Sequence, residues 1–321
     1  MSEPRRLGPV VAHVALVLGR ALIAIGVLLL LFVGYELWGT NLNEASAQKT
    51  LEHRYEQLRQ SVGASSTTTP TTGTTTPDTD NSTLNLPNGK PAASNGPAPK
   101  IGDPIGVIKI PKIHVDKTMV EGVSDAELRR GPGHYPSTPL PGQRGNAGIA
   151  GHRTTYGAPF ADIDQLEAGD DIVVETVQGT FYYKVMGDPL IVAPTDVQVL
   201  DDFGDNRLTL TACHPRYSAA KRIIVQAKLV GPPVQPLAGQ HQGQAMRFHI
   251  DIGWGQYLPM IRWGLLCAAI WAVTWAASRE LDRRFALGWR RWAPYVAGVP
   301  VFLLALWAFF GQVSTLLPSN F

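Results

Sequence analysis

The stretch Arg207-Leu208-Thr209-Leu210-Thr211-Ala212-Cys213 decides the fold, because polar and apolar residues alternate along it as in a half-buried β-strand. Leu208, Leu210 and Ala212 would face a core, and Cys213 would share the opposite face with the two threonines. A second run with the same period extends from Lys221 to Val230 after a short connection. The two runs predict an antiparallel hairpin with Cys213 and Arg222 on the same non-core face near its loop.

Further β-rich runs precede this hairpin, at Gly106 to Ile110, Asp171 to Thr176 and Thr180 to Met186. Turn residues separate them, which is typical of a small barrel or sandwich. Two short helical pieces are expected between the strands, from Ser124 to Arg129 and from Pro159 to Leu166. Residues 101–232 are therefore predicted to form one all-β domain, long enough for an independent core.

Three apolar stretches lie outside this domain, from about Pro9 to Trp38, Tyr257 to Ala277 and Trp292 to Leu317. Each reaches the length of about 20 residues that a membrane-spanning helix needs. Arginines precede the first stretch, and five more lie between the last two, which predicts that these polar segments are cytoplasmic. The alternatives are a signal peptide cleaved near Ala45-Ser46-Ala47, and a buried helical hairpin in a soluble protein.

The expected organisation follows from these segments. In order, it is a cytoplasmic tip and transmembrane helix (1–40), a polar helical stalk (41–61), a Thr/Pro/Ser/Gly-rich linker (62–100), the β-rich domain (101–232), a linker (233–256), a transmembrane helix (257–278), an arginine-rich cytoplasmic loop (279–291) and a transmembrane helix (292–317). Leu51, Tyr55 and Leu58 have helical spacing, and the stalk is expected to be solvated, with a partner-binding helix as the alternative. The chain would be a multi-pass protein of the cell membrane, with its N-terminus cytoplasmic and the β-rich domain extracellular.

Composition excludes some classes of function. The net charge of +2 provides no basic field for nucleic acid. Two cysteines, Cys213 and Cys267, are too few for a disulfide framework. Neither a metal nor a cofactor is expected, because the acidic residues Asp201, Asp202 and Asp205 lack convincing ligand spacing and read as a solvated loop.

Cys213 is the one thiol expected outside the membrane, and on its own it would more often be a core cysteine. An arginine on the same face, Arg222, can lower the pKa of a thiol or stabilise an oxyanion, although alone it would read as a solvated strand residue. A cysteine acyltransferase also needs an acid and base. His152 is the best candidate, because it follows the small, apolar run 146–151 at a strand end. His214 would point away from Cys213, and His134 in a Gly/Pro loop would support the site.

These residues together resemble the sortase family. Thr209-Leu210-Thr211-Ala212-Cys213-His214-Pro215 followed by Arg222 is similar to the family signature TLxTC-x-P…R, with Ala212 where many members have threonine. Gly145-Asn146 leading to Ala150-Gly151-His152-Arg153, the opening strand from Gly106 to Ile113, Gly133-His134-Tyr135-Pro136 and Leu140-Pro141-Gly142 also fit. The stretch from His152 to Gly157 resembles the same segment of class E sortases. The resemblance covers roughly residues 104–230.

The resemblance implies an all-β, sortase-type eight-stranded β-barrel with short helices, joined here to one N-terminal and two C-terminal transmembrane helices. Cys213 would attack the Thr–Gly carbonyl of a C-terminal sorting signal, of LPxTG type or, in class E, LAxTG type. His152 would move the protons and Arg222 would stabilise the oxyanion. The expected substrate-binding residues are Thr211, Ala212, Tyr156 and His134.

The implied partners are surface proteins that carry a sorting signal, a lipid-linked cell-wall precursor with a free amine, and the membrane, without nucleic acid. Two alternatives stay open. One is a cysteine peptidase or L,D-transpeptidase, although the Ser-His-Gly that precedes the cysteine of L,D-transpeptidases is missing. The other is a catalytically silent, membrane-anchored binding module.

Overall fold

The computed structural model describes residues 9–65, 98–237, 240, 257–284 and 292–314. Most of the Thr/Pro-rich linker, most of the second linker and the end of the arginine-rich loop lie outside the described residues. The chain divides into two compact units, residues 1–39 with 251–316, and residues 40–250 with 317–321.

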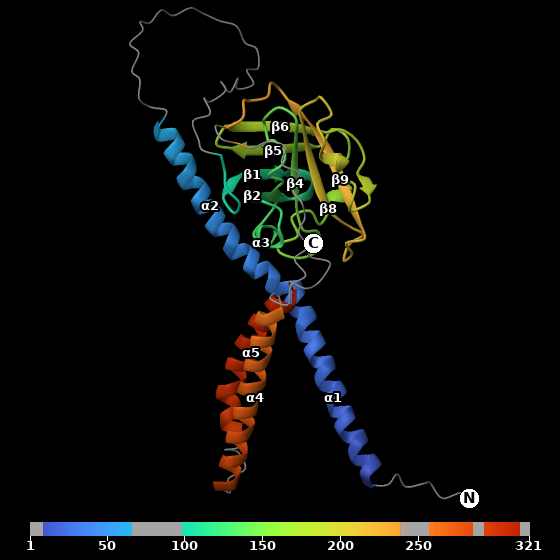
Figure 1. Cartoon of the computed structure of the whole chain (residues 1–321), viewed down its shortest axis with the longest axis vertical. Coiled ribbons are helices and arrows are strands. Elements are labelled where there is room, and N and C mark those ends of the chain that lie inside the picture. Colours follow the sequence, from blue (N-terminus) through green and yellow to red (C-terminus); the bar gives the residue numbers. More distant parts are fainter. Residues whose placement is uncertain (1–8, 66–97, 238–239, 241–256, 285–291, 315–321) are drawn as a thin grey trace, which may run out of the picture. The chain divides into compact units, whose positions relative to one another are not determined.

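The second unit contains a closed barrel of eight strands (Figure 1). The strands pair in the order β6-β5-β1-β2-β3-β4-β8-β9, and a pairing between β6 and β9 closes the ring. The pairs β2–β3 and β4–β8 are parallel, and the other pairs of the ring are antiparallel. The bounds are β1 (Pro104–Ile110), β2 (Val115–Glu121), β3 (Gly133–His134), β4 (Asn146–Ala150), β5 (Asp171–Thr176), β6 (Gly179–Val185), β8 (Arg207–His214) and β9 (Lys221–Val230). The predicted eight-stranded barrel is confirmed, and a ninth short strand, β7 (Leu190–Val192), pairs with β9 beside the ring.

Alternation along the strands builds the barrel core. On β8, Leu208, Leu210 and Ala212 are buried in this core, as the period of the sequence predicts. Strand β9 contributes every second residue in the same way: Ile223, Val225, Ala227 and Leu229. The two strands are antiparallel neighbours, so their non-core faces lie on one side and are available for a site.

Short helices connect the strands. A single turn, α3 (Asp125–Leu128), begins after Ser124, close to the expected position. The expected helix from Pro159 to Leu166 is wrong in extent, because only a 3-10 turn at Ile163–Gln165 forms. The amides of Ala161, Ile163 and Gln165 each donate to the carbonyl three residues back, as in 3-10 turns, and not four residues back as in an α-helix.

Helix α2 (Thr40–Ser65) lies beside β1 and β2 (Figure 1). The expected solvated stalk is corrected here, because Leu51 and Tyr55 are buried, with 0% and 4% of their surface exposed. The helical spacing therefore marks a face that packs on the barrel. A buried polar residue on the same helix, Glu44, belongs to this contact.

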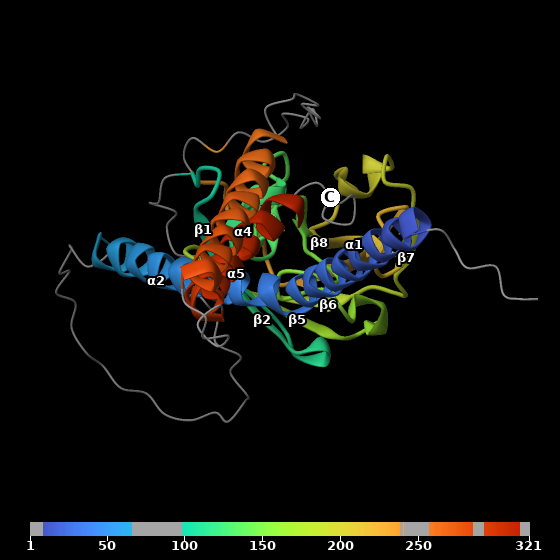
Figure 2. The same ribbon diagram turned by 90° about the horizontal axis from the view of Figure 1, so that it is seen from below.

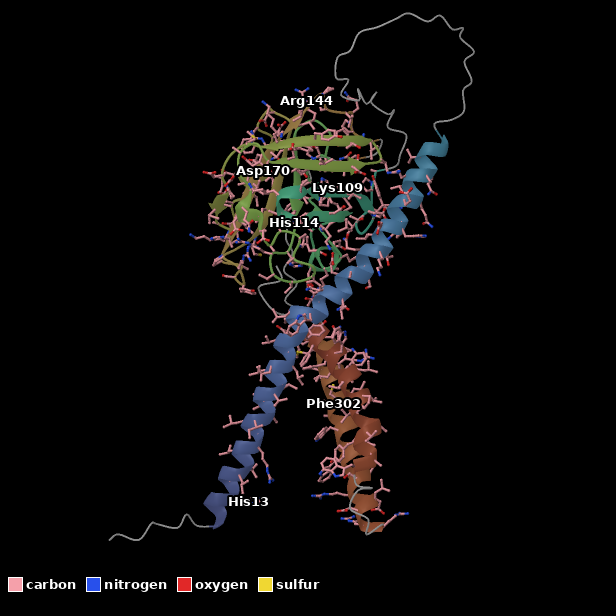
Figure 3. All side chains as sticks on the ribbon, turned by 180° about the vertical axis from the view of Figure 1, so that it is seen from behind. His13, Lys109, His114, Arg144, Asp170 and Phe302 are labelled. Carbon is pink, nitrogen blue, oxygen red and sulfur yellow. The ribbon has the colours of Figure 1, made fainter. Side chains whose placement is uncertain are left out.

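The first unit contains helices α1 (Pro9–Gly34), α4 (Leu258–Arg284) and α5 (Ala293–Ser314), with a π-helical turn at Tyr35–Gly39 after α1. The described residues include three helical stretches long and apolar enough to cross a membrane. Helices α4 and α5 run side by side (Figures 1 and 2). The ring centres of Tyr35 and Trp307 are 4.9 Å apart, and Phe302, labelled in Figure 3, packs against the same apolar cluster. Helix α4 extends to Arg284, so the first residues of the arginine-rich segment are helical.

Candidate active site

Cys213 lies near the end of β8, directly opposite Arg222 on β9. The β8–β9 register pairs these two residues, so both side chains leave the same face of the hairpin. The sequence-based expectation for this pair is therefore confirmed by the strand register. Carbonyls at the hairpin loop orient the arginine, because Nη1 of Arg222 donates to the oxygens of Ala219 and Lys221, each at 3.1 Å.

His152 reaches the same place from a different strand. Strand β4 pairs in parallel with β8, and Ala150 lies opposite Thr211. The two parallel strands run in the same direction. Two residues beyond the Ala150–Thr211 pair, His152 therefore lies level with Cys213. The amide of Gly151 extends the pairing by donating to the Thr211 oxygen at 3.0 Å. The pairing of β4 with β8 thus brings His152 and Cys213, 61 positions apart in the sequence, to one place.

The three candidate catalytic side chains line one pocket of about 400 Å³. His152, Cys213 and Arg222 all line this pocket, together with the expected substrate-binding residues Thr211 and Ala212. The segment between β7 and β8 also lines this pocket, with Val197 and Leu200 among its residues. A mostly apolar cleft with a few convergent polar groups is the usual form of a ligand site.

His152 is buried, with 5% of its surface exposed, and its Nε2 has no hydrogen-bond partner among the described residues. Burial, and after it the positive charge of Arg129, lowers the pKa of His152 from 6.5 to about 4. The ring is therefore neutral at physiological pH and presents an unpartnered nitrogen. A neutral imidazole nitrogen can accept a proton from a thiol in the same pocket.

There is very little space for a side chain at Gly151, the residue before His152. A Cβ atom at Gly151 would lie 2.6 Å from Cδ2 of Phe160, whose ring is fully buried. The amide of Phe160 also donates to the oxygen of His152 at 3.1 Å. Glycine at position 151 is therefore required by close packing next to the candidate acid/base.

Burial raises the pKa of the Cys213 thiol, while the charges of Arg222 and then Arg153 lower it. The net direction is upward, so the thiol is the dominant form at neutral pH. Sequence reasoning gave Arg153 no role, although it is adjacent to His152. Arg153 is buried; its Nη2 lies 2.7 Å from the Asp164 carboxylate, and its Nη1 donates to Nδ1 of His214 at 3.1 Å.

Tyr135 is a second residue that sequence reasoning missed. It lines the pocket and shares a hydrogen bond of 3.1 Å with the Thr211 hydroxyl. Its position beside His134 in the Gly-His-Tyr-Pro motif was the available signal. The hydroxyl pair connects the β3–β4 turn to the strand that carries Cys213.

The other two expected substrate-binding residues do not line the pocket. His134 is buried in the interior: its Nδ1 lies 2.8 Å from the Glu121 carboxylate and its Nε2 lies 2.9 Å from the Pro139 oxygen. Tyr156 is buried behind His152, with the two ring centres 5.3 Å apart. The Tyr156 ring is therefore placed to support His152.

The described residues contain no group of three or more His, Cys, Asp or Glu side chains that could hold a metal ion. The chemistry available in this pocket is that of a thiol, an imidazole and a guanidinium. Such a set suits acyl transfer through a covalent thioester.

Comparisons with known proteins agree with this geometry. Residues 108–230 match the family model described as the Sortase domain. Sortase SrtE1 of Streptomyces coelicolor is 34% identical over 229 residues, which cover 66% of this chain and 56% of that protein. The chain thus spans a little over half the length of this relative. Sortase D of Bacillus subtilis is 30% identical over 135 residues, covering 41% of this chain and 67% of its own length.

Solved structures give a similar list of relatives. Sortase E from Streptomyces avermitilis is 36% identical and aligns with a TM-score of 0.38 over 41% of this chain and 91% of its own. Two findings show the family of this chain. The barrel matches the family model, and Sortase D of Bacillus subtilis is 30% identical, with 67% of its length covered. The chain belongs to the sortase family of cysteine transpeptidases.

Proposed function

We propose that this chain cleaves a C-terminal sorting signal of LAxTG or LPxTG type between Thr and Gly and transfers the acyl product to the amine of a cell-wall precursor. The observation that carries this proposal is that Cys213, His152 and Arg222 line one pocket. The likeness to SrtE1 at 34% identity supports the LAxTG type of class E. Its surface-protein and lipid-linked partners follow from the same family likeness.

The first half of the reaction makes a thioester. His152 takes the proton of the Cys213 thiol, and the thiolate attacks the threonine carbonyl carbon to form a tetrahedral oxyanion. The Arg222 guanidinium donates to this oxyanion. Protonated His152 then gives its proton to the glycine nitrogen, the C–N bond breaks, and the glycine peptide leaves.

The second half releases the acyl group. The incoming amine attacks the thioester carbonyl, and neutral His152 accepts the proton that the amine loses. The C–S bond breaks, and the Cys213 thiolate takes back a proton from His152. The product contains a new amide bond, and both side chains return to their starting protonation states.

The pKa directions define the resting state of this pair. His152 is neutral and Cys213 is a thiol, because burial disfavours the charged form of each. The reactive thiolate and imidazolium are therefore a minor form, which arises by proton transfer within the pocket.

We also propose that the chain is anchored in the cell membrane by three helices, with the barrel outside and the N-terminus inside. The apolar length of α1, α4 and α5 supports anchoring, and the arginines at 5–6 and between 279 and 291 support the orientation. Anchoring would hold the barrel near lipid-linked acceptor and membrane-tethered substrate. Labelling of single cysteines placed in the 279–291 loop of intact cells tests this, since modification from outside would contradict the orientation.

The activity test uses the full chain in detergent with quenched fluorogenic peptides that contain LAxTG or LPxTG. We expect cleavage by the wild type, amide formation when an amine is added, and no product from Cys213→Ala. The matched control is Cys267→Ala, which changes the other cysteine. If the wild type cleaves neither peptide, the transpeptidase proposal fails and the silent binding module is favoured.

A further inference from the structure

The loop that follows His152 has an unfavourable backbone. Tyr156, Gly157 and Ala158 have φ angles of 50°, 73° and 40°. The left-handed region is disfavoured for residues with a Cβ atom, which applies to two of these three residues. A loop of this kind persists only where contacts outside the loop hold it.

The Tyr156 ring packs against His152 and so connects the loop to the pocket. Its ring centre lies 5.3 Å from that of His152, with an angle of 37° between the planes. The guanidinium of Arg129, at the end of α3, lies 5.3 Å from the same tyrosine ring. The orientation of the His152 ring therefore depends on packing against Tyr156.

Helix α2 supplies the outside contacts. Asn41 Oδ1 accepts a hydrogen bond of 2.9 Å from the amide of Gly157. The Glu44 carboxylate fills the space beside the same glycine, where a Cβ atom would lie 2.6 Å from Glu44 Cδ. Glu44 is 3% exposed, and its Oε1 accepts a hydrogen bond of 2.7 Å from Lys117 on β2.

The next helical turn fixes α2 against the barrel. Gln48 Oε1 accepts from the Thr118 amide at 2.9 Å, and its Nε2 donates to the Thr118 oxygen at 3.0 Å. Asn41, Glu44 and Gln48 are spaced by three and four residues and thus share one helix face. Directional polar contacts of this kind determine where the helix sits, beyond the packing that its apolar residues provide.

We propose that Asn41 and Glu44 are positioning residues for His152, acting through the left-handed loop 156–158 and the Tyr156 ring. The inference rests on the proposed catalytic role of His152. Only the π-helical turn Tyr35–Gly39 separates helix α2 from the first apolar helix along the chain, so the segment that leaves the membrane would also order the active site. The alternative is that α2 only covers β1 and β2, without effect on the chemistry.

The test uses the full chain in lipid nanodiscs, with Asn41→Ala as the main variant and Glu44→Gln as a second that keeps the side-chain shape. The matched control is Arg54→Ala on the same helix, which removes an exposed ion pair with Asp103 of 2.9 Å. Two quantities are measured: kcat and KM for the sorting-signal peptide, and the titration of the His152 Cε1 signal by NMR. A His152→Gln spectrum assigns that signal.

We expect Asn41→Ala to lower kcat about 10- to 100-fold, as for a misplaced catalytic group, with KM changed less than about twofold. The His152 titration should move upward from about 4 towards 6.5, because a looser ring is more hydrated. Asn41→Asp should restore both values, since its carboxylate can accept the same amide hydrogen bond. Arg54→Ala should change neither.

Equal effects of Asn41→Ala and Arg54→Ala on kcat would overturn the inference. An unchanged pKa of His152 in both Asn41→Ala and Glu44→Gln would also overturn it. The titration is independent of turnover. A wild type without peptide cleavage would therefore refute the proposed function, while the NMR result still decides whether α2 holds His152 in place.

Discussion

Burial of neutral His152 is expected to make the barrel less stable in mild acid. Its pKa is about 4 in the fold and 6.5 when unfolded. Between these values the unfolded chain binds more protons than the folded chain, so the free energy of unfolding falls as the pH is lowered. The difference between the two pKa values of His152 corresponds to about 3 kcal/mol, most of which is lost by pH 4. Replacing His152 with glutamine should remove this loss.

Hydrogen exchange of the amides in β4 and β8, measured on the full chain and corrected for the intrinsic pH dependence of exchange, gives the free energy of opening. The matched control is His114→Asn, because His114 lies exposed in the turn after β1 (Figure 3) and its left-handed φ of 56° suits asparagine. Between pH 6.5 and pH 4, the free energy of unfolding of the wild type and of the control should fall by about 3 kcal/mol more than that of His152→Gln. Parallel profiles for all three proteins would refute a buried, neutral His152.

Three further outcomes are expected. Gly151→Ala should lower the free energy of unfolding by about 1–3 kcal/mol through overpacking, whereas Gly187→Ala, which has open space around it, should not; equal thermal midpoints would contradict this. Arg222→Lys should lower kcat about 10²- to 10³-fold with little change in stability, and unchanged kinetics would argue against oxyanion binding. Glu121→Ala leaves the buried His134 without its carboxylate, so denaturant unfolding should show a loss of about 1–3 kcal/mol, and no loss would contradict the structural role of this pair.

Strand periodicity was sufficient to predict one part of the site from the sequence. Every second residue of β8 and β9 lies in the core, because each strand has one face there, and this places Cys213 opposite Arg222. His152 was predicted from a run of small residues, which corresponds to β4. The parallel pairing that brings β4 beside β8 is a long-range contact, and no local pattern encodes it.

Other parts of the site depend on contacts that the sequence does not show. Strand β3 has two residues and β7 three, too short to display a period. His134 was expected near substrate because it lies in a Gly/Pro-rich motif, whereas Glu121 on β2 binds it in the interior. The polar face of α2 read as solvated, because its partner Gly157 lies 116 positions away along the chain.

The nucleophilic role of Cys213 can be tested most directly by trapping the acyl-enzyme. The full chain is mixed with an LAxTG or LPxTG peptide, quenched in acid within one turnover, digested and analysed by mass spectrometry. The account predicts an added mass equal to the peptide acyl group on the fragment that contains Cys213, removed by hydroxylamine as expected for a thioester. An acyl group on any other residue, or continued turnover by Cys213→Ala, would contradict it.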